Sequence, residues 1–140
     1  MISFNYETEF ELQNESDFSK WLSEVILSEN KKEGEINYIF CDDDYLLEIN
    51  QQYLDHDTLT DIISFDLSET KGKLIGEVYI SIDRVKDNAK THKTSLKEEL
   101  LRVIFHGALH FCGYKDKTES DAKQMRFKED NALKQLTDIN

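Results

Sequence analysis

The sequence contains no proline and only two cysteines, Cys41 and Cys112, among its 140 residues. Two cysteines are too few for a disulfide framework, so they predict reduced thiols in a cytosolic protein. No apolar run approaches the roughly 20 residues that cross a membrane. The opening segment MISFNYETEFEL has early acids where a signal peptide has an apolar core, and no segment is of low complexity or resembles a linker. These absences predict one soluble, cytoplasmic domain over residues 1–140.

Basic residues are scarce as well. Seventeen Lys and Arg stand against 29 Asp and Glu, which gives a formal net charge of −12. Non-specific nucleic-acid binding normally depends on a basic surface that releases counterions. The whole molecule is therefore not expected to attract RNA, and any RNA contact would have to use a local basic patch.

The hydrophobic patterns that are present include both strand and helix types. Strands are predicted at Ile2–Tyr6, Ile36–Asp42, Leu59–Leu67 and Leu74–Ile82. Helices are predicted from Ser16 to about Asn30, from Asp42 to Tyr53, from Asp83 to about Lys93, from Ser95 to Cys112, and from about Thr118 to Leu136. Because strands and helices mix without strict alternation, we predict an α+β (mixed α/β) fold. Its one small, mainly parallel mixed sheet would have about four strands packed with helices.

Three segments carry narrower expectations. Residues 31–35, KKEGE, are expected to turn the chain, and the nearly continuous apolar run Leu59–Leu67 is expected in the interior of the sheet. The run Asp42–Asp44 could suggest a cation site. We prefer the ordinary explanation, because acids in the first turn of a helix favour the positive end of its dipole.

The segment HGALHFCGYKD, residues 106–116, carries two histidines four positions apart. Four residues of an α-helix turn through about 400°, so His106 and His110 project about 40° apart, one turn along the axis. This spacing lets two imidazoles reach one metal ion. The histidines share a polar stripe with Glu99 and Arg102 on a helix otherwise suited to a core, and a buried polar stripe needs a partner such as a metal. The alternative is an ordinary pair, one at the surface and one semi-buried.

A third ligand has to come from outside the helix. Gly113 can end the helix in a left-handed conformation, so the chain can fold back and bring Asp116 to the histidines. The alternative is a solvated loop acid between Lys115 and Lys117.

Other potential ligands are less well placed. Cys112 lies two positions after His110 and points to the far side of the helix, which predicts a buried structural thiol. His56 and His92 lie in loop or helix-end contexts and are predicted at the surface.

Two histidines and one carboxylate leave a tetrahedral ion with one open position, the pattern of catalytic rather than closed structural zinc. The sequence therefore predicts a hydrolytic site with one Zn²⁺ per chain, held by His106, His110 and Asp116. Such a ligand set also accepts other divalent ions.

Residues 106–116 resemble the H-G-x-L-H-L-x-G-Y-D-H signature of the YbeY family of metal-dependent endoribonucleases. Two upstream segments are similar to further parts of that family: NQQYLDHDTLTDIISFD (Asn50–Asp66) resembles N-x-x-Y-R…T-D-V-L-S-F-P, and GEVYISIDRV (Gly76–Val85) resembles G-D-I-x-I-S. The three segments occur in the same order and cover most of residues 50–116.

The resemblance implies a zinc-bound, single-domain fold that cleaves single-stranded RNA. It implies a role in maturation of the small-subunit ribosomal RNA 3′ end and in ribosome quality control, with the ribosomal small subunit or assembly proteins as partners. It maps His106 and His110 onto the first two zinc-binding histidines.

Three positions depart from the family pattern. Asp116 stands where the third histidine falls, and Asp66 replaces a proline. Leu54 stands where an arginine follows the tyrosine, so Arg102 or Lys115 would have to replace it if that arginine orients phosphate. Glu99 is a candidate for acid–base or supporting work, with a solvated helix acid as its alternative.

Two other functions stay open at this point. A metallopeptidase would use a helical two-histidine site, but Gly107 stands where its H-E-x-x-H helix carries a glutamate base. A non-catalytic ribosome-assembly factor would use the metal for folding only.

Overall fold

A four-stranded sheet with the strand order β1-β2-β4-β3 organises the chain. The computed structural model describes residues 1–70 and 72–139. Strand β1 (Ile2–Tyr6) pairs in parallel with β2 (Lys32–Cys41), which pairs in parallel with β4 (Lys73–Ser81). Strand β3 (Ile62–Asp66) pairs antiparallel with β4 at the edge. The predicted α+β class with a mainly parallel mixed sheet is confirmed.

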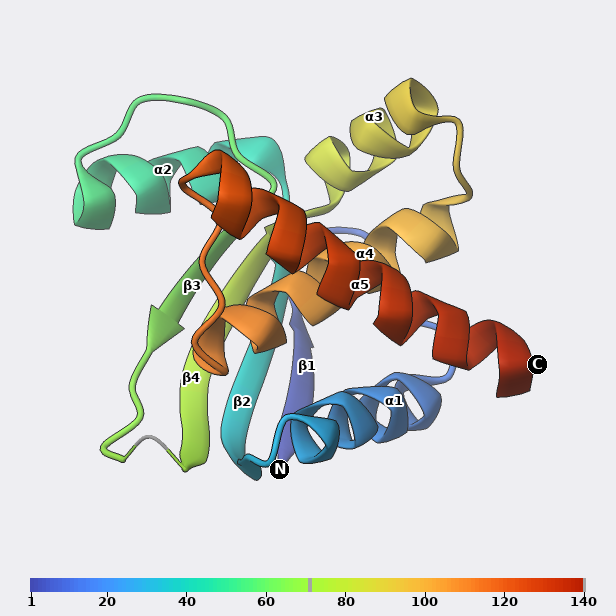
Figure 1. Ribbon diagram of the computed structural model, residues 1–140. Helices are drawn as coiled ribbons and strands as arrows, with labels where there is room; N and C mark the ends of the chain where they lie inside the picture. The colour runs from blue at the N-terminus through green and yellow to red at the C-terminus, as the bar shows by residue number, and fades with distance from the viewer. Residues whose placement is uncertain (71, 140) are drawn as a thin grey trace.

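Five helices surround this sheet in the described part of the chain: α1 (Glu15–Ser28), α2 (Asp43–Leu54), α3 (Ile82–His92), α4 (Leu96–Phe111) and α5 (Glu119–Ile139). Helix α4 lies across one face of the sheet, and α5 packs on α4 (Figure 1). Helix α2 packs on the opposite face, where Leu46 joins Cys41 and Ile63 in a small second cluster. Successive strand residues alternate between the two faces, which explains why the two clusters remain separate.

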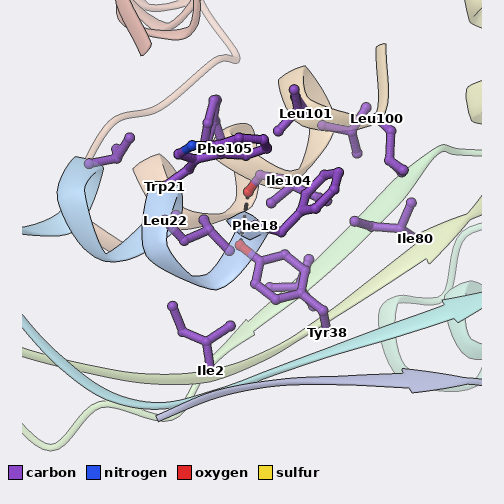
Figure 2. Packing of buried hydrophobic residues seen from close by; sticks show 14 of the residues in the cluster. Ile2, Phe18, Trp21, Leu22, Tyr38, Ile80, Leu100, Leu101, Ile104 and Phe105 are labelled. Carbon is purple, nitrogen blue, oxygen red and sulfur yellow. Dashed lines mark hydrogen bonds between the residues drawn. The ribbon is translucent and has the colours of Figure 1, made fainter. Parts of the chain in front are cut away.

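The main core lies between the sheet and helices α1, α4 and α5. Figure 2 shows Phe18, Trp21 and Leu22 of α1 beside Ile104 and Phe105 of α4, above the strands. Tyr38 of β2 is fully buried, and its hydroxyl donates to the backbone oxygen of Ile104 at 2.8 Å (Figure 2). This contact ties the central helix to the central strand, which fixes the part of α4 that carries the histidines.

Three predicted details are wrong. Strand β3 is an edge strand rather than an interior one; its apolar run is explained because α4 covers Ile62 on one face and the second cluster covers Ile63 on the other. Residues 32–35 belong to β2, because a register irregularity between Glu33 and Ile36 lets the strand start early.

The third detail is the start of α1. Asn14, in a left-handed conformation, precedes the helix, and Ser16 is already within it. Asn14 makes no side-chain cap bond; its backbone oxygen instead accepts from the Asp17 amide at 3.0 Å.

The first turn of α2 has the structure predicted for its aspartates. Asp42 caps the helix by accepting from the Tyr45 amide at 2.9 Å, and Asp43 and Asp44 follow in the first turn. None of the described helices is long and apolar enough to cross a membrane.

Candidate metal centre

Helix α4 positions both histidines and then turns the chain back toward them. Ser95 begins the helix by accepting from the Glu98 amide at 3.1 Å, and Gly113, with a φ of 107°, lies just beyond its end. The Tyr114 amide then donates to the Leu109 oxygen at 3.1 Å. A glycine tolerates this left-handed conformation without steric cost, so the chain reverses here as predicted.

The reversal brings Asp116 to the two imidazoles. Its Oδ2 lies 3.1 Å from His106 Nε2 and 3.4 Å from His110 Nε2. In the described part of the chain these three residues form the one group whose ligand atoms all lie within 4.8 Å of one another. The three residues that the spacing singled out therefore meet at one point in space.

Each histidine is oriented by the nitrogen that faces away from this point. His110 Nδ1 lies 2.9 Å from the backbone oxygen of Tyr114, and His106 Nδ1 lies 2.6 Å from Oε2 of Glu129. A carbonyl or carboxylate oxygen only accepts, so both Nδ1 atoms carry the hydrogen and donate it. In the neutral form of each ring, Nε2 is then left with a free lone pair that faces Asp116, and this is the form that binds metal.

Glu129 itself is held by an arginine. Its carboxylate is almost fully buried on α5, 5% exposed, and its Oε1 accepts from Arg102 Nη1 at 3.0 Å. Arg102 Nη2 donates to Asp130 Oδ1 at 2.8 Å. The guanidinium therefore neutralises Glu129 from the side opposite to His106, which makes burial of that carboxylate tolerable.

The charges around His106 shift its proton affinity. Burial alone would lower the pKa of His106, but the hydrogen bond to Glu129 and the charges of Glu129, Asp116 and Asp61 raise it above its ordinary value. The pKa of Asp61 is raised, whereas the pKa of a carboxylate in an ion pair is usually lowered. Burial raises the pKa of Asp61 more than the charge of His106 lowers it.

The cluster opens into a cleft of about 900 Å³. Its described lining residues come from β3, from α2, α3, α4 and α5, and from the loops that precede β3 and α5. A cleft of this size with a few convergent polar groups is typical of a ligand site.

The structure corrects the interpretation of Glu99. It is only 3% exposed, so it is not the solvated helix acid considered as the alternative. Its oxygens accept from Thr94 Oγ1 at 3.2 Å and lie 3.3 Å from His92 Nδ1. His92 at the end of α3 and Thr94 in the loop before α4 therefore bind the Glu99 carboxylate, and the spacing of residues along the sequence does not reveal these contacts.

The remaining candidates lie outside the cluster. Cys112 is partly buried at the rim of the core, and burial raises its pKa to about 11, as expected for a structural thiol. His56 and His92 are exposed, as predicted, although both contribute to the wall of the cleft. Lys115 is exposed and lies outside the described residues that line the cleft.

Glu129 and Asp61 are the residues that the sequence reasoning missed. A signal for Glu129 was present, since it occupies the same face of α5 as three buried apolar residues, Met125, Ala132 and Leu136. A carboxylate in an apolar stripe needs a partner. Asp61 likewise interrupts the apolar run of residues 59–67.

Comparison with known proteins gives consistent matches over nearly the whole chain. The family model described as Endoribonuclease YbeY matches residues 2–137. A protein of Flavobacterium psychrophilum named Endoribonuclease YbeY is 63% identical over 134 residues, covering 96% of this chain and 95% of the relative. A protein of Cytophaga hutchinsonii with the same name is 49% identical, covering 93% and 91%. The solution structure of TM1509 from Thermotoga maritima is similar with a TM-score of 0.69 and 28% identity, covering 95% of this chain and 87% of that one.

Proposed function

The chain belongs to the YbeY family of endoribonucleases, and from this premise we propose that it cuts single-stranded RNA at a centre formed by His106, His110 and Asp116. It is a hydrolase that acts on RNA. The observation that carries the proposed site is the convergence of two oriented Nε2 atoms and one carboxylate oxygen at the cleft.

The donor set fits one divalent ion per chain. A tetrahedral ion with bonds of about 2.0 Å separates its ligand atoms by about 3.3 Å, and the two distances from Asp116 to the imidazoles are 3.1 and 3.4 Å. Imidazole nitrogen with one carboxylate is typical of catalytic zinc, so we propose Zn²⁺. When bound, such an ion supplies Lewis acidity to a phosphodiester and to water.

The protein's own residues prepare the site for this chemistry. Glu129 and the Tyr114 carbonyl hold the imidazoles in one tautomer and one orientation. Arg102, considered above as a replacement for an arginine that orients phosphate in catalysis, is assigned the role of positioning Glu129, since its guanidinium donates to two carboxylates. Glu99 is occupied by Thr94 and His92, which supports a role in shaping the cleft wall rather than in proton transfer.

The surroundings of Gly107 disfavour a peptidase. A Cβ atom at this position would lie 3.1 Å from Val78 Cγ1 and 3.2 Å from Ile62 Cδ1, so position 107 faces the sheet. A glutamate there would be directed into the core rather than toward the two histidines. The helical histidine pair in this chain therefore lacks both the residue and the space for the base of an H-E-x-x-H peptidase.

In the cell, we place this activity in ribosomal RNA maturation. The substrate would be the single-stranded 3′ region of the small-subunit precursor, with ribosome quality control as a second role. The ribosomal small subunit or its assembly proteins would be the partners, in the cytoplasm. A non-catalytic assembly factor with a structural metal is the competing function.

One experiment separates these functions. Purified protein is incubated with an end-labelled single-stranded RNA and with the same RNA in a duplex, with and without chelator, and its zinc content is measured. Wild type should hold about one zinc per chain and cut only the single strand, and chelator should abolish cutting. His110→Ala and Asp116→Ala should lose zinc and activity, whereas Glu119→Ala, at an exposed acid on α5, should match wild type.

The outcomes that contradict the proposal are distinct. Cutting that survives chelator and both ligand substitutions points to a contaminating nuclease. A zinc-loaded wild type that cuts no RNA, while its ligand variants melt at lower temperature, supports the non-catalytic factor.

A further inference from the structure

The cationic side chains at the cleft differ in how far their charge is already used. Arg102, Lys117 and Arg126 all line it. The guanidinium of Arg102 donates to Glu129 and to Asp130 and is largely buried. Its charge is therefore already paired with carboxylates of the protein. This pairing does not support the suggestion that Arg102 replaces the arginine that the family carries at the position of Leu54.

Lys117 and Arg126 are in a different state. Both are exposed, and neither makes an ion pair or a side-chain hydrogen bond with the side chains that the structure describes, those of residues 1–70 and 72–136. Lysine and arginine side chains in this state keep their full charge and most of their donors for a ligand.

Their positions place both beside the candidate metal centre. Lys117 directly follows Asp116, whose carboxylate lies between the two imidazoles. Arg126 is three residues before Glu129 on α5, so the two project from neighbouring positions of one helix face. Because Glu129 contacts His106, Arg126 lies on the same side of the cleft as that histidine.

Among the described residues that line the cleft, no lysine or arginine belongs to α2, to β3 or to the loop between them. Leu54 at the end of α2, Thr58 and Thr60 line that side together with the acids Asp61 and Asp66. A polyanion entering the cleft is therefore attracted toward α5 and repelled from β3. With a net charge of −12 over the whole chain, attraction of this kind has to be local.

We propose that Arg126 and Lys117 bind the phosphates that flank the scissile one, and so hold single-stranded RNA against the α5 side of the cleft. This inference rests on the proposed function. Arginine can bind a phosphate with two parallel hydrogen bonds, whereas lysine acts as a point charge, so Arg126 is expected to contribute the larger share. Lys115, the other suggested replacement for the family's arginine, lies off the cleft and is assigned no role.

The test measures binding separately from cutting. Zinc-loaded protein is titrated into a fluorescein-labelled 2′-O-methyl oligouridine, checked on a gel to be intact, at several KCl concentrations between 50 and 300 mM. Arg126→Gln should weaken binding roughly fivefold at low salt, and Lys117→Gln should weaken it by a smaller factor. Each should also reduce the slope of log Kd against log salt by about 0.7, the value for one phosphate contact on a single strand.

Matched variants make the result specific. Arg126→Lys should keep the wild-type slope, and Lys20→Gln, at an exposed lysine of α1 away from the cleft, should keep both slope and affinity. On cleavable RNA, each Gln variant should raise KM by about the factor by which it weakens binding of the oligonucleotide, and it should change kcat less than twofold. Zinc content equal to wild type shows that the metal centre is intact.

Two results would overturn the inference: Gln variants whose slopes equal that of Lys20→Gln, or a wild type that does not bind the oligonucleotide. Both differ from failure of the proposed function, in which wild type binds with the expected salt dependence but cuts no RNA.

Discussion

Oε2 of Glu129 lies 2.6 Å from Nδ1 of His106, although the two residues are 23 positions apart and lie on different helices. The carboxylate fixes which imidazole nitrogen carries the hydrogen, and it is in turn paired with Arg102. Removing it should therefore affect both metal affinity and stability.

Glu129→Ala should weaken zinc binding about 10- to 100-fold, the usual effect of losing a carboxylate behind a ligating histidine. It should also lower the free energy of unfolding by about 3 kcal/mol, since Arg102 and His106 lose their buried partner. Zinc affinity is measured by competition with a coloured chelator, and stability by urea unfolding. Glu129→Gln keeps an acceptor oxygen for His106 and should retain more zinc affinity than Glu129→Ala.

Asp130 supplies the control for that prediction, because it pairs with the same arginine but is 55% exposed. Asp130→Ala should cost less than about 1 kcal/mol and leave zinc affinity unchanged. Equal effects of the Glu129 and Asp130 substitutions would mean that the arginine, rather than the contact with His106, determines the result.

The protonation of His106 predicts how the metal-free protein responds to pH. Because its pKa is raised in the folded state, the stabilising contribution of the protonated ring is complete below about pH 6.5. It is lost as pH rises through the higher folded value. Asp61, whose folded pKa is also raised, acts in the same direction, since it favours the folded state less once it ionises.

The chelated protein should therefore have a higher Tm at pH 6 than at pH 8. The zinc-loaded protein should show the reverse, because the metal competes with the proton for His106 and is bound more tightly at higher pH. Thermal scans with chelator and with excess zinc at both pH values check this. Parallel pH trends in the two series would show that His106 does not exchange a proton for the metal.

How far the sequence predicts the site depends on how local each contact is. The pairing of His106 with His110 follows from the helix period, and the return of Asp116 follows from the chain reversal at Gly113, three residues before it. Glu129 and Arg102 meet through the packing of α5 on α4, and no local period encodes that distance. The charge pair is nevertheless what permits the buried carboxylate.

The fold shows the same division. The four strands and five helices were predicted because each has its own hydrophobic period, and errors were confined to ends such as Asn14 and Lys32. The place of β3 at the sheet edge was missed, because a strand covered on both faces has the same apolar run wherever it pairs. Edge or centre is decided by tertiary contacts alone.

The ionised carboxylate of Asp61 in the cleft wall should lower the free energy of unfolding. Its raised pKa means that ionisation at neutral pH opposes folding. Asp61→Asn removes the charge but keeps a polar group beside Asn88, whose Nδ2 donates to Asp61 Oδ2 at 3.5 Å. We expect Tm at pH 7.5 to rise by roughly 2–4 °C. Near pH 3.5, where the free carboxyl is largely protonated, the difference should shrink; a difference that grows on acidification would contradict this account.

Two glycines of the β3–β4 region provide the last prediction. A Cβ atom on Gly76 would lie 2.5 Å from Phe111 Cζ and 2.7 Å from the backbone oxygen of Phe65, whereas one on Gly72 would have no neighbour within 4 Å. The Phe65 oxygen cannot move without breaking the β3–β4 ladder, so Gly76→Ala should lower the free energy of unfolding by about 2–3 kcal/mol. Gly72→Ala should stay within about 0.5 kcal/mol of wild type.

Because Phe111 directly follows His110, displacing the Phe111 ring should also weaken zinc binding in Gly76→Ala but not in Gly72→Ala. Urea unfolding and zinc competition on the two variants test both effects, and equal stabilities would show that the core at Phe111 yields more readily than its packing implies.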